Sequence, residues 1–328
     1  MYKIPNDTGH PWRVNKFIDY HSLGDADMNF PILKEYCNEH KLSVNNRFWL
    51  AFLYSTCYCV PTTCFLFEHL DIKTVTQESV EEFWSEYKPK MIFQSDKRYV
   101  KNMNWFVTLV VNFIELTHRR PSSFFKQLER GNQQENYDVL YAIMLKWKYF
   151  GRFTTFLLIE AIHKLTPLKA DSTWFDWKNG NTATSGMMHV LYLDKEAVEF
   201  DAKGTLDIEV KELLQKRFIT VKNLIEKRYP NASNNITDIE TALCGFRKLF
   251  KASRYGGYYI DRVQEEIITM EKWMPQEKPL WDEMYRFRRR AFPAEFLGEL
   301  QGYKGIQKKR NTDFIEKGLT GVESISKH

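Results

Sequence analysis

Hydrophobic residues recur at helical spacing along most of the chain. On a helical wheel for residues 237–252, Leu243, Phe246 and Leu249 fall on one side. The same spacing predicts helices over residues 45–59, 78–87, 97–118, 136–148, 151–165, 207–228, 237–252, 258–272 and 279–290. The only strand-like run, HVLYLD at 189–194, stands alone. We therefore expect an all-α protein, with one continuous helical body or two packed helical lobes.

Turn-forming residues separate these periodic segments. Loops are predicted at 121–123, 131–134, 167–186, 230–235, 256–257 and 275–279. Thr237 and Glu240 have the spacing of a capping box, which predicts a helix start at Thr237 and gives Glu240 a possible structural role. The predicted organisation is an N-terminal extension (1–40), a helical catalytic domain (41–290) and a basic, partly disordered C-terminal tail (291–328).

One uncharged run of 20 residues, at 48–67, is long enough to span a bilayer. It contains several hydroxyl side chains and is broken by Pro61, so we expect a buried helix that ends near Cys59 and a second short helix after it.

The start of the sequence lacks an apolar leader, and the five cysteines fit a reducing compartment. We expect no membrane association. We also expect no metal, because no His or Cys residues have ligand spacing.

Positive charge is concentrated near the end of the sequence. Residues 286–310 contain eight basic and two acidic residues, against a formal net charge of +5 for the whole chain. Such a segment suits a polyanion such as the DNA backbone, and a solvated terminus explains it equally well.

A second polar cluster lies opposite the apolar face of 237–252. Glu240, Cys244, Arg247 and Lys248 share that polar face. A paired glycine at 256–257 is predicted to end the helix and to bring the tyrosine-rich segment beyond it close to the same face. Grouped cations, a thiol and tyrosines favour a site for an anionic substrate.

Upstream, residues 151–191 contain the order GRF…IEAI…D…W…SGMMHVL, and ETALCGFRK…RYGGYYIDR follows at 240–262. Together they resemble the amino acid:DNA transferases (α-glutamyl/putrescinyl thymine pyrophosphorylases) of phages that hypermodify thymine. NNRFWLAFLYSTCY at 45–58 and DKRY at 96–99 also resemble that family, so the resemblance covers roughly 40–290. The chain departs from the family pattern at 181–186, where NTATSG replaces an expected Gly-Pro-Gly turn. A different substrate choice would follow if that turn holds the base or the nucleophile.

The resemblance implies a helical fold like that of the DNA glycosylases, related to the helix-hairpin-helix proteins. The implied reaction takes double-stranded DNA that carries 5-pyrophosphoryloxymethyl-uracil. A free amino acid such as glycine or serine, or a polyamine, displaces pyrophosphate from it. No cofactor is expected, since the amino acid is a co-substrate. Such an enzyme would work in the cytoplasm of the infected bacterial host.

This chemistry assigns roles to particular residues. A carboxylate must take the proton of the amine, and cations must hold the leaving diphosphate. The candidate catalytic residues are Asp171, Asp176, Glu240, Cys244 and Asp261. The candidate pyrophosphate and substrate ligands are Arg247, Lys248, Arg254, Arg262 and Ser185. Stacking on a base turned out of the duplex is assigned to Trp174, Trp177, Tyr255 and Tyr259. Contacts with the DNA backbone are assigned to Arg152, Arg286, Arg288, Arg289 and Arg290.

Three alternatives stay open. The chain could be a non-catalytic phage DNA-binding protein, or a DNA N-glycosylase. Cys244 could add to C6 of the pyrimidine as a thiolate, since the neighbouring Arg247 and Lys248 should lower its pKa, or it could serve only in packing. Among the carboxylates, Asp171 is the first choice as the base, by analogy with the glycosylase loop.

Overall fold

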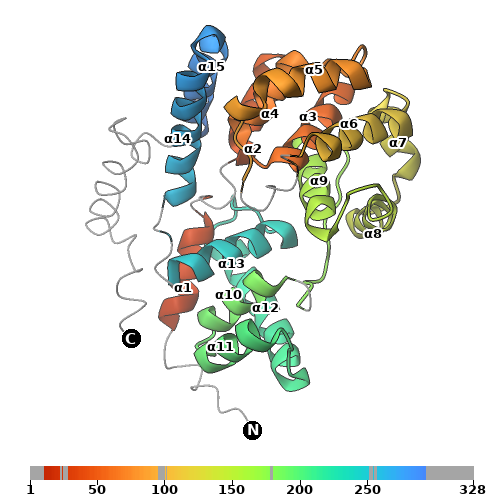
Figure 1. Ribbon diagram of the computed structural model, residues 1–328. Helices are drawn as coiled ribbons and strands as arrows, with labels where there is room; N and C mark the ends of the chain where they lie inside the picture. Colours follow the sequence, from red (N-terminus) through yellow and green to blue (C-terminus); the bar gives the residue numbers. More distant parts are fainter. Residues whose placement is uncertain are drawn as a thin grey trace. The chain divides into compact units, whose positions relative to one another are not determined.

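The computed structural model describes residues 11–22, 24, 29–94, 100, 102–177, 180–250, 254 and 257–292. All regular structure in these ranges is helical, which confirms the all-α prediction (Figure 1). The chain divides into two compact units. The first unit comprises residues 1–28, 173–261 and 298–328, and the second comprises 29–172 and 262–297. Helix α14 (Tyr258–Trp273) begins in the first unit and continues in the second.

The second unit contains most of the helices. They are α2 (Asn29–Glu39), α3 (Val44–Cys57), α4 (Val60–His69), α5 (Gln77–Tyr87), α6 (Met103–Thr117), α7 (Pro121–Leu128), α8 (Gln133–Met144), α9 (Arg152–Leu165) and α15 (Lys278–Ala291), with the 3-10 turns η2 (Lys88–Lys90) and η4 (Pro275–Glu277). Helix α3 packs against α4, α7 and α9, and every residue from Phe48 to Cys57 is buried. An amphipathic helix would expose one face, so this helix forms the centre of the unit.

The uncharged run at 48–67 divides as predicted. Helix α3 ends at Tyr58, whose left-handed backbone (φ 53°) closes the helix, and α4 follows with Pro61 in its first turn. No helix of the described residues combines the length and the apolar character that crossing a membrane requires. The run is therefore the core of the second unit.

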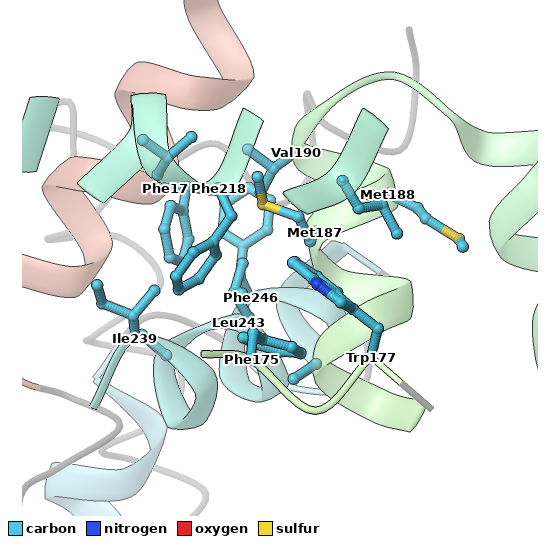
Figure 2. Packing of buried hydrophobic residues seen from close by; sticks show 14 of the residues in the cluster. Phe17, Phe175, Trp177, Met187, Met188, Val190, Phe218, Ile239, Leu243 and Phe246 are labelled. Carbon is cyan, nitrogen blue, oxygen red and sulfur yellow. The ribbon is translucent and has the colours of Figure 1, made fainter. Parts of the chain in front are cut away.

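The first unit is built from α1 (Pro11–Ser22), α10 (Asn181–Val190), α11 (Asp194–Lys203), α12 (Ile208–Arg228) and α13 (Ile236–Phe250). Helices α1, α11 and α13 pack against α10. Their apolar faces meet in a cluster that includes Phe17, Met187, Leu243 and Phe246 (Figure 2). The polar residues Glu240, Cys244, Arg247 and Lys248 of α13 lie at the edge of this cluster and are half-buried.

The strand-like run HVLYLD forms the end of α10, a turn and the start of α11, in keeping with the all-α prediction. Several local predictions were wrong. Part of the predicted loop at 167–186 is helical, because α10 begins at Asn181. The segment 121–123 is not a loop, because Pro121 occupies the first turn of α7, where its missing N–H costs nothing. Helix α13 begins at Ile236, so Thr237 lies inside its first turn instead of capping it. There the Ser233 hydroxyl bonds to the Asp238 carboxylate.

The predicted domain limits at residues 40 and 290 stay predictions. The two compact units meet along the chain near residues 28, 172 and 261. The predicted tail beyond 292, and the DKRY motif at 96–99, lie outside the described residues.

Candidate active site

Helices α10 and α13 approach each other through their backbones. A Cβ added at Gly186 would lie 2.3 Å from the carbonyl oxygen of Leu243, a distance that real Cβ atoms do not adopt. Further contacts join Gly180 to Glu240 and Ser185 to Arg247. The two close approaches, Gly180 to Glu240 and Gly186 to Leu243, advance in the same direction along both helices, so the helices run in the same sense. Their N-terminal ends therefore lie at the same end of the contact.

The N-terminal end of this contact brings the Glu240 carboxylate close to the main chain of Asp176. Gly180 precedes α10, and its N–H donates to the carbonyl oxygen of Asp176 at 2.8 Å. A Cβ at Gly180 would lie 3.0 Å from Oε1 of Glu240, so the Glu240 carboxylate lies against the start of α10. The dipole of a helix favours negative charge at that end. The main chain at Asp176 and the carboxylate of Glu240, predicted from separate segments, thus lie close together.

Farther along the contact, Arg247 joins two other helices. Its Nε donates to the Ser185 hydroxyl at 3.0 Å, and its Nη2 pairs with the Asp201 carboxylate of α11 at 2.7 Å. Ser185 is buried, and this bond fixes the orientation of the guanidinium plane. Both predicted ligands therefore meet in the fold. An incoming anion would share Arg247 with Asp201.

The corner between α13 and α14 groups cations with aromatic rings. Lys248 Nζ lies 3.4 Å from the hydroxyl of Tyr259 and 5.9 Å from its ring centre. The Arg254 guanidinium lies 4.2 Å from the ring centre of Tyr258, and the Tyr258 and Tyr259 rings meet edge to face at 5.2 Å. The predicted proximity of Lys248, Arg254 and Tyr259 is present in the structure. Tyr255 lies outside the described residues.

Cys244 differs from the four other cysteines. It is partly exposed on α13 and packs at the edge of the first unit's core, whereas Cys37, Cys57, Cys59 and Cys64 are buried. Its position on the polar face agrees with the helical wheel. Its role as a nucleophile stays a prediction.

The two predicted tryptophans have different surroundings. Trp174 is 53% exposed. Trp177 is 3% exposed, with its ring stacked on Phe175 at 4.0 Å and in edge contact with Phe218 at 5.6 Å (Figure 2). A ring covered in this way cannot stack on a base unless the core opens. We therefore reassign Trp177 from base stacking to packing in the core.

Three candidates lie near or beyond the boundary between the units. Asp261, in the first turn of α14, is 1% exposed, which removes it from direct contact with solvent. Arg262 belongs to the second unit, where its Nε donates to Glu266 at 2.9 Å. Asp171 also belongs to the second unit and is buried, with its N–H donating to the carbonyl oxygen of Gln133. The predicted roles of these three residues stay predictions.

The arginines assigned to the DNA backbone are mostly engaged within the second unit. Arg286 and Arg290 of α15 both pair with Glu39 of α2, at 3.1 and 2.9 Å. Arg288 is buried, so its assignment to a DNA contact is corrected. Arg289 and Arg152 are exposed. Pairing with carboxylates reduces the positive field that the α15 cluster presents.

The sequence did not reveal Asp201 or the two contact glycines. Asp201 is far from Arg247 in the sequence, and its side chain reaches the arginine only because α11 packs against α10. The small residues of α10 indicated a loop, although Gly186 is needed for close packing.

Among the described residues, no group of three or more His, Cys, Asp or Glu side chains could hold a metal ion.

Comparison with known proteins identifies the group to which the chain is related. The sequence model of a family described as amino acid:DNA transferase matches residues 28–255, which is more than half of the chain. The chain belongs to the amino acid:DNA transferase family. It is also 22% identical, over 299 residues, to a protein of Salmonella phage ViI named serinyltransferase. That alignment covers 84% of this chain and 71% of the phage protein. No solved structure matches the chain.

Membership in the amino acid:DNA transferase family makes the protein an enzyme whose substrates are an amino acid and DNA. The matched segment runs from α2 to the corner after α13 and so includes parts of both units. It contains Asp176, Gly180, Ser185, Glu240 and Arg247. The residues grouped at the α10–α13 contact therefore lie within the part of the chain that defines the family.

Proposed function

We propose that this amino acid:DNA transferase acts on a hypermodified thymine in double-stranded DNA. In this proposal, the amino group of an amino acid displaces pyrophosphate from 5-pyrophosphoryloxymethyl-uracil. The observation that carries the proposal is the family match over 28–255, which includes the carboxylates and cations of the α10–α13 contact. The serinyltransferase relative supports a small amino acid, serine or glycine, as the nucleophile.

The proposed reaction is a substitution at the exocyclic carbon of the base. The nitrogen of the amino acid forms a bond to the 5-methylene carbon, and the bond from that carbon to the pyrophosphate oxygen breaks. Pyrophosphate leaves with the electron pair of the broken bond. The proton of the attacking ammonium group passes to a carboxylate of the protein.

Glu240 is the carboxylate that we assign as the base. It lies against the start of α10, on the same face of α13 as Cys244 and Arg247. Arg247 and Lys248 supply positive charge about two turns farther along α13, where the leaving diphosphate needs it. Arg247 suits this role because Ser185 already orients its guanidinium plane.

Access to the base requires the modified nucleotide to leave the duplex. We propose that an aromatic side chain of the first unit, the exposed Trp174 or the half-buried Tyr259, stacks on the extruded base. The likeness to DNA glycosylases, noted from the order of the motifs, belongs to the same proposal. We further propose that the reaction takes place in the cytoplasm of the infected bacterial host.

The test is a reaction with a defined substrate. A duplex that contains 5-pyrophosphoryloxymethyl-uracil is incubated with the protein and with glycine, serine, glutamate or putrescine in turn, and is then digested to nucleosides for mass spectrometry. We expect an amino acid–thymidine adduct and an equal amount of pyrophosphate. Abasic sites would identify a glycosylase, and unchanged nucleosides a binding protein. Either result would overturn the proposal.

Glu240→Gln is the informative variant in the same assay, because it keeps the shape of the side chain and removes the base. We expect a fall in kcat of about 10²-fold or more. We also expect duplex affinity close to wild type. Glu212→Gln, on the exposed face of α12 in the same unit, is the matched control. Equal activity of the two variants would exclude Glu240 as the base.

A further inference from the structure

The turn that follows α8 and enters the first residues of α9, at residues 145–153, is basic and lacks acidic residues. It reads LKWKYFGRF and contains Lys146, Lys148 and Arg152, and no Asp or Glu occurs between Asp138 and Glu160. All three cations are exposed. Within the described part of the chain, neither Lys146 nor Lys148 forms an ion pair. The positive charge of this turn is therefore presented to solvent.

Aromatic rings alternate with these cations. Tyr149 stacks on Trp105 of α6, with ring centres 4.3 Å apart and planes 10° from parallel. Lys148 Nζ lies 5.5 Å from the centre of the Tyr149 ring. Phe153, in the first turn of α9, is 43% exposed and meets the edge of Tyr58 at 6.0 Å. Large apolar rings that remain in contact with solvent beside cations are typical of surfaces that bind nucleic acid.

The backbone of the turn carries strain at one of these rings. Tyr149 has a φ of 64°, in the left-handed region that aromatic residues rarely occupy. Such conformations persist where the surroundings hold them, and they concentrate at functional positions. Here the stack on Trp105 holds the ring.

A comparison with α15 shows how the turn differs from the other basic segment of the second unit. Glu39 pairs with both Arg286 and Arg290, and Arg288 is buried. At α15 a phosphate would compete with Glu39 for Arg286 and Arg290 and would meet only the exposed Arg289 directly, whereas at the turn it would meet both Lys146 and Lys148 directly. The exposed charge of the described residues thus favours the turn over α15 as the DNA contact.

We propose that the turn 145–153, together with Trp105, is the surface through which the second unit binds the double-stranded DNA substrate. Lys146 and Lys148 contact phosphates, and Tyr149 and Phe153 pack against sugars and bases. This inference depends on DNA as the acceptor in the proposed function. The proposed chemistry takes place in the first unit, and this inference assigns a DNA-binding surface to the second unit. That surface includes Arg152, which the sequence analysis assigned to a contact with the DNA backbone.

The decisive measurement is DNA binding over a range of salt concentrations. The full chain is titrated onto a fluorescent, unmodified duplex of about 20 base pairs, and affinity is followed by anisotropy. For Lys146→Ala/Lys148→Ala, we expect affinity about 10-fold weaker at about 0.1 M salt. We also expect the plot of log K against log salt concentration to become less steep by about 1.8, since two phosphate contacts are lost and each contributes about 0.9 to the slope.

A matched pair of lysines controls for net charge. Lys88 and Lys90 lie in η2 of the same unit, and Lys90 Nζ also lies over an aromatic ring, 5.2 Å from the centre of Tyr87. We expect Lys88→Ala/Lys90→Ala to bind as the wild type does. Equal losses in the two double variants would show a general charge effect and overturn the proposal. So would wild-type binding by Lys146→Ala/Lys148→Ala.

Phe153→Ala tests the aromatic part of the surface. We expect affinity about 5-fold weaker with an unchanged salt slope, because no phosphate contact is removed. Leu145→Ala, a similarly exposed residue in the same turn, should bind as the wild type does. A Phe153→Ala protein with wild-type affinity and an intact thermal transition would contradict the contact. Because the assay contains neither modified base nor amino acid, a failed transfer reaction would leave this binding result valid.

Discussion

Arg247 and Asp201 form a 2.7 Å ion pair between α13 and α11, and Arg247 is also the cation that we propose to hold the leaving diphosphate. The two opposite charges largely cancel. Arg247 therefore presents its full positive charge to an anion only when that anion displaces the Asp201 carboxylate. Catalysis and structure therefore make opposing demands on one guanidinium.

We expect Arg247→Ala to lower the transfer rate by about 10²-fold, because a charge-assisted contact to the leaving group is lost. Asp201→Asn should keep most of the activity and lower KM for the pyrophosphorylated DNA, since it releases Arg247 from its competitor. Steady-state kinetics on the modified duplex measures both effects. Lys211→Ala, on the exposed face of α12, is the charge-matched control. Equal losses in Arg247→Ala and Asp201→Asn would indicate a purely structural pair.

Gly186→Ala should destabilise the protein by about 3 kcal/mol, because the added methyl group overlaps the Leu243 backbone and α10 must move away from α13. Thermal unfolding followed by circular dichroism measures the loss. Gly131→Ala is the control, because the nearest atom to its added Cβ is 3.8 Å away. Similar unfolding midpoints for the two variants would contradict the close packing.

Cys244→Ser separates the two roles proposed for that thiol. If the amino acid displaces pyrophosphate directly, the variant should retain turnover within about 2-fold of wild type, since serine has nearly the same volume. If a thiolate adds to the pyrimidine first, turnover should fall by about 10³-fold or more. Trapping with denaturant and mass spectrometry of the intact protein detects any covalent adduct.

Trp174→Ala and Trp177→Ala should give opposite results. Removing Trp177 empties a site between Phe175 and Phe218 and should cost about 4 kcal/mol of stability. Removing the exposed Trp174 should change stability by less than about 1 kcal/mol and, if it stacks on the extruded base, weaken binding of modified DNA. Denaturant unfolding and anisotropy on modified and plain duplexes distinguish the outcomes. A stable Trp177→Ala protein would contradict the core assignment.

Burial raises the pKa of Glu266 above its ordinary value, and Arg262 opposes the shift. Between the unfolded and folded pKa values, the folded state binds more protons, so stability falls as pH rises through that window. Glu266→Gln removes the titration and keeps an oxygen that can accept from Arg262. We expect its unfolding midpoint to decline less than that of wild type between about pH 5 and 7. Equal declines in the unfolding midpoints of Glu266→Gln and wild type would contradict the raised pKa of Glu266. The control Glu212→Gln, exposed on α12, should follow the wild type.

Strong amphipathic periodicity explains the part of the fold that the sequence predicted. Helices α9, α12, α13 and α14 lie within two residues of their predicted limits, because each has a long apolar stripe. Helix α10 was missed, since Thr, Ser and Gly in NTATSG favour turns in isolation. Its burial against α13 reverses that preference, and only tertiary packing could reveal it.

The candidate site was predictable to a similar degree. Ser185 and Arg247 were assigned to one site by resemblance, and they are hydrogen-bonded in the structure. Asp201 was not foreseen, because an ion pair between different helices leaves no local pattern in the sequence. The burial of Trp177 was missed for the same reason: its covering ring, Phe218, comes from α12.

The absence of a side chain at Gly186 has a consequence for how this enzyme can change. Two helices that touch main chain to main chain have no rotamer between them that could adjust, so substitutions elsewhere in the core cannot tune their separation. In the proposed site, a new choice of amino acid would therefore come from the polar residues of α13 or from the start of α10, with the distance from Ser185 to Arg247 held constant.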